Sequence, residues 1–319
     1  MAGGTLDCWP LHLFVGDCVT VNLAINVMTG CELDFHAAPN IEIEIRDLNY
    51  KKNFADITSL LRCPDKELLL AQKILEYFVP KEGFVLTTFS QSPVGGGLGG
   101  SSSLCISLIK AFNKSNGRSM STHEMVELAH NLEAKVIKSP TGTQDYFSAI
   151  LRGLNIIHYK ADGIKVEPVP YIPDIFSNNM ILIYTGKSHH SGINNWQVIK
   201  SVIDGDERTI SALKEIAQIS AEMAIVCRQQ AWDKLPELFR SEFDSRIKLT
   251  TSFSSPEIEK LRKIVMQEGA QAVKICGAGG GGCVFVWADP SRHEGITETC
   301  QKSGFQVIKM QPVKANQPF

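Results

Sequence analysis

The residues best suited to chemistry begin with a glycine-rich segment that runs directly into three serines, Pro93-Val94-Gly95-Gly96-Gly97-Leu98-Gly99-Gly100-Ser101-Ser102-Ser103. A strand-like apolar run (84–89) precedes it and a helical pattern (104–113) follows it. Glycine lets backbone N–H groups approach a ligand closely. A helix that starts here directs its unpaired N–H groups and positive dipole end at the segment. This order of elements predicts an anion site, with phosphate as the usual occupant.

Two other nucleotide-binding motifs and a plain surface loop are alternatives for this segment. Gly95, Gly97 and Gly100 satisfy the dinucleotide-binding pattern G-x-G-x-x-G. That fingerprint normally follows the first strand of a βαβ unit and precedes an acidic residue about 20 positions on. Here a long, mostly β-patterned stretch precedes it and a helical pattern follows, so the dinucleotide interpretation is disfavoured. A Walker A loop is excluded because no Gly-Lys-Ser/Thr follows. A mobile surface loop remains the structural alternative.

Two carboxylates, Glu133 and Asp145, flank a break in a helical pattern. Glu133 lies in the last turn of the pattern at 123–135, and Asp145 opens the next helix after Pro140-Thr141-Gly142-Thr143. Near a phosphate loop, one carboxylate can hold Mg²⁺ while the other orients and deprotonates an acceptor hydroxyl. Carboxylates near helix ends are also common structural residues, so a capping role for Asp145 is the alternative.

A second glycine-rich segment, Gly277-Ala278-Gly279-Gly280-Gly281-Gly282, separates two apolar strand-like runs at 273–276 and 283–287. By itself it indicates a hairpin turn or a place where two backbones approach closely. A loop with so few side chains predicts packing against another loop. The segment at 95–100 is the expected partner.

The surrounding elements are expected to position these residues. Hydrophobic periodicity predicts strands at 11–15, 18–27, 31–35, 41–45, 84–89, 153–159, 164–169, 180–184, 273–276, 283–287 and 306–310. It predicts helices at 64–78, 104–113, 123–135, from 144, and at 191–203, 207–230, 232–249, 256–268 and 290–303. Ser119 or Ser121 is expected to cap the helix at 123–135. Strands mixed with helices, without regular βαβ alternation, predict the α+β class in two parts.

Composition limits the function further. The chain has 319 residues, 44% of them apolar, and a formal charge of -2, so nothing favours a nucleic-acid partner. No apolar run reaches the length of a membrane helix, and Met1-Ala2-Gly3-Gly4 lacks the order of a signal peptide. Nine cysteines without a CxxC pair argue against a disulfide framework or a zinc site. A cytoplasmic protein is expected.

Three motifs carry a resemblance to a known family. The segment at 93–103 resembles the phosphate-loop motif P-x-x-x-G-L-G-S-S of the galactokinase, homoserine kinase, mevalonate kinase and phosphomevalonate kinase (GHMP) superfamily, with Gly100 in place of the first serine. The segment from Lys274 to Gly282 resembles the third family motif, K-x-x-G-A-G-G-G-G. The segment from Gly142 to Phe147 is similar to the sugar-kinase pattern G-x-x-D-Q-[YF], which carries the catalytic aspartate.

The resemblance implies an ATP- and Mg²⁺-dependent kinase. It assigns Asp145 as catalytic base and Ser101 with Glu133 as Mg²⁺ ligands. Nucleotide contacts are expected from Pro93, Gly95, Gly96, Gly97, Leu98, Gly99, Gly100, Ser101, Ser102 and Ser103. It also implies the two-domain fold of these kinases, with an N-terminal mixed-sheet domain at 1–165 and a C-terminal ferredoxin-like α/β-plait domain at 166–319.

Several segments resemble the sugar-1-kinase branch typified by heptose 7-phosphate kinases, which implies a sugar or sugar phosphate phosphorylated at the anomeric hydroxyl. Gly3-Gly4-Thr5-Leu6-Asp7 is similar to that branch's sugar-binding G-G-T-D, with Leu6 inserted. Acceptor contacts are therefore expected from Thr5, Asp7, Asp145, His189, Gly279 and Gly280. Arg246 and Lys248 are weaker candidates for a phosphate on the acceptor, with a solvated helix face as the alternative.

The resemblance leaves three points open. In family members a first strand precedes the segment at 3–7 and contributes a basic residue near the acceptor hydroxyl, and the printed sequence begins at Met1. That positive charge is expected from elsewhere. A mevalonate-type acid kinase and a non-catalytic nucleotide- or sugar-binding relative of the kinases are the alternative functions. A small-molecule substrate is expected, with no nucleic-acid or membrane partner, and a homodimer is compatible with the sequence.

Overall fold

The computed structural model describes residues 1–188, 191–277 and 279–315, without the side chains of 191–194 and 251. The chain forms two compact units. The first contains residues 1–26, 93–98 and 139–319, and the second contains residues 27–92 and 99–138. The expected domains were 1–165 and 166–319, and the boundary between them falls inside strand β7 (Gly163–Val169) of the first unit. The compact units therefore divide the chain differently from these expected domains.

The second unit contains one mixed four-stranded sheet in the order β2-β5-β3-β4. Strand β3 (Ile41–Ile45) runs parallel to β5 (Gly83–Ser90), and β2 (Thr29–His36) and β4 (Tyr50–Phe54) are antiparallel to their neighbours. The alternation expected for 41–45 is confirmed, because its three isoleucines are buried while its two glutamates are partly exposed. Strand β4 was not predicted; it carries three polar residues and forms an edge of the sheet.

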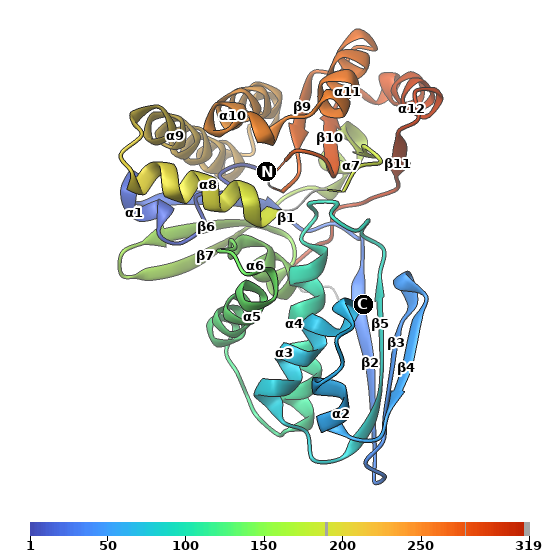
Figure 1. The fold of residues 1–319 in the computed structure, drawn as a ribbon. Helices are drawn as coiled ribbons and strands as arrows, with labels where there is room; N and C mark the ends of the chain where they lie inside the picture. The colour runs from blue at the N-terminus through green and yellow to red at the C-terminus, as the bar shows by residue number, and fades with distance from the viewer. Residues whose placement is uncertain (189–190, 278, 316–319) are drawn as a thin grey trace. The chain divides into compact units, whose positions relative to one another are not determined.

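Helices cover this sheet (Figure 1). They are α2 (Ile57–Leu61), α3 (Leu69–Phe78), α4 (Gly100–Ser115) and α5 (Thr122–Ile137), with short 3-10 turns at Arg46–Leu48 and Lys66–Leu68. Phe78, Phe84 and Phe112 form an aromatic core between helices and sheet, with ring centroids 5.9 Å apart for Phe78–Phe112 and 5.6 Å for Phe84–Phe112. The sheet and its aromatic core thus support α4, which follows the glycine–serine segment in sequence, and α5 packs on α3 and α4.

The first unit contains an antiparallel sheet in the order β1-β6-β7, built from β1 (Cys18–Leu23), β6 (Leu154–Lys160) and β7. The hairpin expected at Asp162-Gly163 is confirmed, with Lys160 paired to Gly163. The short helices α1 (Leu11–Val15) and α6 (Gln144–Leu151) contact this sheet. The prediction of a strand at 11–15 is wrong: these five residues, four of them apolar, form one helical turn after Pro10, and only Leu11 is buried.

The other sheet of the first unit has the order β11-β8-β10-β9, with every neighbouring pair antiparallel. Its strands are β8 (Met180–Tyr184), β9 (Ala272–Ile275), β10 (Cys283–Trp287) and β11 (Gln306–Ile308). Its helices are α7 (Pro173–Asn179), α8 (Ser191–Ile203), α9 (Glu207–Gln229), α10 (Leu235–Leu249), α11 (Pro256–Gln267) and α12 (His293–Lys302), with 3-10 turns at Trp232–Lys234, Thr251–Phe253 and Pro290–Arg292. This strand order and connectivity confirm the expected α/β plait and the α+β class.

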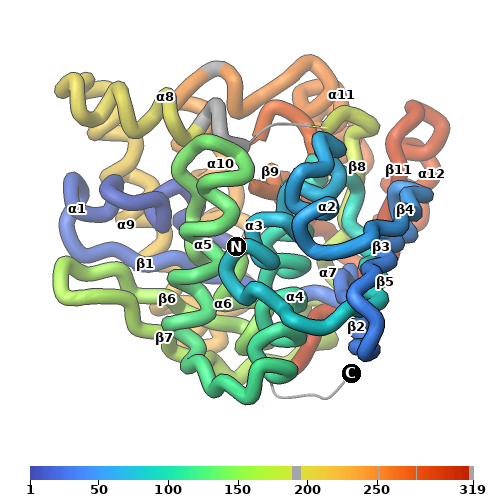
Figure 2. Tube along the Cα trace, turned by 60° about the horizontal axis from the view of Figure 1, so that its bottom comes forward, coloured from blue at the N-terminus to red at the C-terminus, as the bar shows by residue number. Residues whose placement is uncertain are grey.

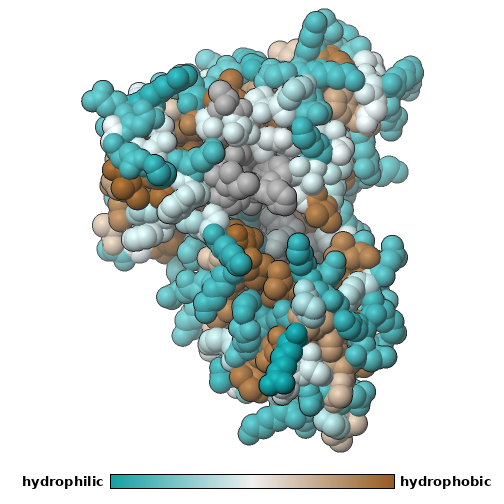
Figure 3. All heavy atoms as spheres, in the orientation of Figure 1, coloured by the Kyte–Doolittle hydropathy of each residue, from teal (hydrophilic) through white to brown (hydrophobic). Residues whose placement is uncertain are grey.

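Surface features are consistent with the composition. The face in Figure 3 is largely hydrophilic, with a hydrophobic patch beside α1, where Leu13 and Phe14 are exposed. Figures 1 and 2 show α1, α8 and α9 side by side within the first unit. Among the described helices, none has the length and apolar character needed to cross a membrane. The nine cysteines are free thiols.

Candidate active site

The two glycine-rich segments pack backbone to backbone within the first unit, as the sequence predicted. The Cys283 N–H donates to the Gly96 carbonyl oxygen at 2.7 Å. A Cβ placed on Gly97 would lie 2.6 Å from the Cys276 carbonyl oxygen, and one on Gly277 would lie 2.8 Å from the Gly97 Cα. Only glycine fits such an approach. The contact leaves the 93–98 loop shaped by backbone atoms rather than by side chains.

Two other segments of the first unit hold the second glycine segment in place. The Gly282 N–H donates to the Lys187 carbonyl oxygen at 2.7 Å, and the Thr185 hydroxyl donates to the Gly282 carbonyl oxygen at 2.9 Å. On its other side, the Gly280 N–H donates to the Phe253 carbonyl oxygen at 2.9 Å. The backbone groups of Gly280 and Gly282 are therefore used inside the protein, and the loop is anchored at both ends.

Helix α4 begins directly after the first glycine segment. Gly99 precedes it in the left-handed conformation, with φ of 70°, and the helix starts at Gly100. A Cβ on Gly100 would lie 2.8 Å from the Ser92 Cβ. This contact explains why a glycine stands where the family motif has its first serine. A helix of 16 residues presents unpaired N–H groups and a positive dipole end at its start, which favours an anion there.

Within the second unit, the serine that contacts Glu133 is Ser102. Its hydroxyl donates to Glu133 Oε2 at 2.9 Å, and both side chains are buried, at 7% and 5% exposure. Ser101, the serine expected beside Glu133 at a metal, is exposed on the first turn of α4. No group of three or more His, Cys, Asp or Glu side chains suited to a metal occurs among the described residues. One carboxylate and serine hydroxyls fit a Mg²⁺ ion that takes its other ligands from phosphate and water.

Asp145 lies in the first turn of α6 in the first unit. This position stabilises its charged form, because the helix start is positive. Burial raises the pKa of the Cys276 thiol to about 11, although the positive charge of Lys274 acts to lower it. The negative charge of Asp145 contributes to the rise. The Asp145 charge also contributes to the raised pKa of Cys8, for which burial is the main cause. The carboxylate thus lies within electrostatic range of the second glycine segment and of the N-terminal turn.

The N-terminal turn brings Asp7 to the start of α6. Asp7 is 4% exposed, and its Oδ2 accepts a hydrogen bond from the Gln144 N–H at 3.1 Å. Burial raises the pKa of Asp7, and the hydrogen bond from Gln144 and the charge of Arg246 oppose the rise. A Cβ on Gly142 would lie 2.0 Å from Asp7 Oδ2, which explains the glycine of the motif. Asp7 is therefore a buried carboxylate that accepts from the first N–H of α6.

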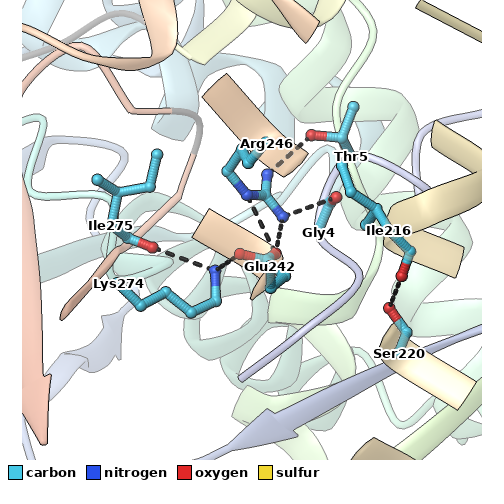
Figure 4. Close-up of polar contacts among 8 residues, drawn as sticks. All are labelled: Gly4, Thr5, Ile216, Ser220, Glu242, Arg246, Lys274 and Ile275. Carbon is cyan, nitrogen blue, oxygen red and sulfur yellow. Dashed lines mark hydrogen bonds and ion pairs between the residues drawn. The ribbon is translucent and has the colours of Figure 1, made fainter. Parts of the chain in front are cut away.

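A buried ionic network next to this turn was not predicted from the sequence (Figure 4). Arg246 donates through Nη2 to the Gly4 carbonyl oxygen at 2.9 Å and through Nη1 to the Thr5 hydroxyl at 3.1 Å. Its Nε donates to Glu242 Oε1 at 3.1 Å, and Lys274 Nζ lies 2.7 Å from Glu242 Oε2. Burial acts to raise the pKa of Glu242, but the Arg246 and Lys274 charges outweigh it and lower this pKa to about 2.

The other residues predicted to contact the acceptor molecule differ in burial and in bonding partners. Thr5 is buried and accepts the Arg246 hydrogen bond. A Cβ on Gly279 would lie 2.3 Å from the Phe253 carbonyl oxygen. His189 lies outside the described residues. Arg246, considered for an acceptor phosphate, is 1% exposed inside the ionic network, and Lys248 pairs with Glu215 at 2.6 Å. Sequence could have indicated the network only through the i, i+4 spacing of Glu242 and Arg246.

Comparison with known families gives two matches. The model of the GHMP kinases N terminal domain matches residues 67–153, and that of the GHMP kinases C terminal domain matches residues 223–304. The first spans the 93–103 segment, Glu133 and Asp145, and the second spans Glu242, Arg246 and the second glycine segment.

Individual kinases are also similar to this chain in sequence or in structure. The D-glycero-alpha-D-manno-heptose 7-phosphate kinase of Campylobacter jejuni is 26% identical over 235 residues, covering 72% of this chain and 69% of that protein. The mevalonate kinase of Thermococcus gammatolerans is 24% identical over 312 residues, covering 89% of this chain and 87% of that protein. Among solved structures, a D-glycero-D-manno-heptose 1-phosphate kinase from Bacteriodes thetaiotaomicron superposes with a TM-score of 0.78 at 20% identity, covering 98% of this chain and 93% of that one.

Proposed function

This chain belongs to the GHMP kinase family, whose members use ATP as phosphate donor, and from that membership we propose that it phosphorylates a hydroxyl of a sugar or sugar phosphate. The proposed hydroxyl is the anomeric one, on a heptose 7-phosphate-like acceptor. The observation that carries the proposal is the place of Asp145 in the first turn of α6, next to Gln144, whose N–H donates to the buried Asp7 carboxylate.

Asp145 is the proposed catalytic base. Phosphoryl transfer needs little covalent chemistry from the protein, so positioning and charge stabilisation are its main contributions. An anionic carboxylate can accept the proton of the acceptor hydroxyl and orient its oxygen toward the γ-phosphorus. The helix dipole favours a negative charge at the start of α6. The first turn of α4 offers unpaired N–H groups to a phosphate, and the backbone-lined 93–98 loop is a second candidate source of such groups.

The proposed metal is Mg²⁺, held by Glu133 and the Ser101 hydroxyl together with phosphate oxygens and water. The Ser102–Glu133 hydrogen bond of 2.9 Å supports this assignment, because it fixes the orientation of the buried carboxylate. When bound, Mg²⁺ neutralises charge on the β- and γ-phosphates. Ser102 keeps Glu133 in one rotamer, and Ser101 leaves its hydroxyl accessible at the helix start.

The acceptor class rests on the similarity to sugar-phosphate kinases and on the segment from Gly3 to Asp7. A mevalonate-type acid is the second candidate, because an archaeal mevalonate kinase is similar over 89% of the chain. An acid acceptor requires a cation for its carboxylate. Among the described residues of the first unit, the buried side chains of Arg246 and Lys274 both pair with Glu242, which supports the sugar.

The test is ATP consumption by the purified protein with a panel of heptose, hexose and their phosphates, with mevalonate included. We expect turnover with a sugar or sugar phosphate, and loss of at least a thousandfold in kcat for Asp145→Asn with nucleotide binding retained. Transfer to mevalonate alone would establish the acid kinase. ATP binding without transfer to any acceptor would indicate a non-catalytic relative. Full activity of Asp145→Asn would remove the base from the mechanism.

A further inference from the structure

The N-terminal turn contains a residue in an unfavourable backbone conformation. Thr5 has a φ of 78°, in the left-handed region that a Cβ-branched residue rarely adopts. Such a conformation persists only where the surroundings impose it, and it often marks a functional site. Thr5 is also 5% exposed, so its hydroxyl needs a partner inside the protein. Something in the first unit must therefore hold this turn.

Arg246 is the residue that holds the turn (Figure 4). Its two terminal nitrogens donate separately to Thr5 Oγ1 at 3.1 Å and to the Gly4 carbonyl oxygen at 2.9 Å, so both the side chain and the preceding backbone are fixed. The planar guanidinium offers these donors in a rigid arrangement that a lysine lacks. The pair of hydrogen bonds therefore selects one conformation of the turn.

Arg246 is itself fixed on its other side. Glu242, one helical turn earlier on α10, accepts from Arg246 Nε at 3.1 Å. The second carboxylate oxygen of Glu242 pairs with Lys274 at 2.7 Å. The guanidinium carbon lies 5.7 Å from the centre of the Phe253 ring. These side chains are almost fully buried. Movement of Arg246 would therefore leave the buried negative charge of Glu242 with only Lys274 to neutralise it.

The turn that Arg246 holds leads directly to the proposed base. Asp7 follows Thr5 by two residues, and the Cys8 N–H donates to the Thr5 carbonyl oxygen at 3.1 Å. Asp7 Oδ2 then accepts from the Gln144 N–H, the residue before Asp145. A change of φ at Thr5 would displace the Asp7 carboxylate, and the tight contact at Gly142 leaves it little alternative space.

We infer that Arg246 is a positioning residue for phosphoryl transfer, which holds Thr5 in the left-handed conformation so that Asp7 fixes the first turn of α6 and the Asp145 carboxylate. The inference rests on the proposed role of Asp145. Arg246 contacts neither the nucleotide nor the acceptor in this account. Its removal should lower kcat and leave the KM for ATP unchanged.

The first experiment changes Thr5 alone, which keeps the ion pairs of Glu242 with Arg246 and Lys274. Thr5→Ala keeps a Cβ at the strained position but loses the hydroxyl, so we expect kcat to fall about tenfold. Thr5→Gly loses the same hydroxyl but adopts positive φ without strain, so we expect its kcat to be several-fold higher than that of Thr5→Ala. Equal losses in the two variants would overturn the inference.

The second experiment tests rescue. Arg246→Met should lower kcat about 10- to 100-fold. Adding Thr5→Gly should restore a large part of it, because glycine needs no residue to hold it in place. The matched control is Arg262→Met, since Arg262 also pairs with a carboxylate, Asp244 at 2.9 Å, and lies 4.8 Å from a phenylalanine ring. The control should keep wild-type kcat. Absence of rescue in a folded double variant would show a purely structural role for Arg246.

A third measurement does not depend on activity. Hydrogen exchange of the peptide at 142–147 reports the Gln144 N–H, which donates to Asp7. We expect faster exchange in Thr5→Ala and Arg246→Met and restored protection in Arg246→Met/Thr5→Gly. If exchange follows this pattern but neither wild type nor any variant transfers phosphate, the proposed function fails, while the coupling of Arg246 to Asp7 and the start of α6 stands. If wild type is active and exchange is unchanged in both single variants, the positioning role is wrong.

Discussion

Individual glycines of the two glycine-rich segments are required because backbone atoms occupy the space of a side chain. Gly97 faces the Cys276 carbonyl oxygen, and Gly100 faces the Ser92 side chain. The sequence predicted which two segments meet, since loops with so few side chains pack closely only on one another. It did not predict that Ser102, rather than Ser101, contacts Glu133. That choice depends on the rotation of α4 against α5, which only packing determines.

The serines and Glu133 make a testable prediction at the residue scale. Glu133→Gln should raise the Mg²⁺ concentration needed for half-maximal activity by 10-fold or more, because it removes the carboxylate charge. Ser102→Ala should raise it about 10-fold through loss of the orienting hydrogen bond. A Mg²⁺ titration at saturating ATP measures both.

Ser115→Ala is the matched control for these variants. Ser115 lies at the far end of the same helix, and its hydroxyl donates to the Phe112 carbonyl oxygen. Its Mg²⁺ requirement should equal that of wild type. An unchanged titration for Glu133→Gln would exclude this carboxylate from the metal site.

Whole elements were predicted where the pattern is strong and local. Strands β3, β8 and β10 have the predicted bounds, because each is an apolar or alternating run with clear ends. The run at 11–15 was assigned wrongly, since a five-residue, mostly apolar run does not distinguish one helical turn from a short strand. Strand β4 was missed because its sequence, YKKNF, lacks an apolar pattern and gains its backbone partners only from β3.

Helix α5 carries Glu133 and begins in a capping box, which gives a prediction at this scale. The Ser121 side chain accepts from the Glu124 N–H, and the Glu124 side chain accepts from the Ser121 N–H. Ser121→Ala should therefore lower the free energy of unfolding by about 1 kcal/mol, measured by urea denaturation.

Ser119→Ala is the control for the capping variant, because the sequence predicted either Ser119 or Ser121 as the N-cap of this helix. Ser119 is exposed and lies before the helix. Its substitution should leave the free energy of unfolding unchanged within about 0.5 kcal/mol. A larger effect of Ser119→Ala than of Ser121→Ala would contradict the capping box.

At the scale of the whole molecule, the nucleotide should stabilise the native chain. A ligand that binds only the native state at 100 times its Kd adds about 2.7 kcal/mol, which for a chain of this length corresponds to about 4 °C in Tm. We expect this shift with ATP and Mg²⁺ in a thermal melt. NAD⁺ is the control, because the glycine pattern alone also matches dinucleotide-binding proteins. A shift with NAD⁺ and none with ATP would contradict the kinase assignment.

The sequence by itself determined the family, the α+β class and the identity of the glycine-rich segments, because these depend on residue types and short spacings. Only the tertiary structure decided what Asp7 and Arg246 do. Asp7 meets Gln144 across 137 positions, and Arg246 meets Gly4 across 242. No local pattern encodes such pairs, since their contacts form only when distant elements of the first unit pack together. The position of Asp145 therefore depends on a buried arginine that the sequence presents as an ordinary helix charge.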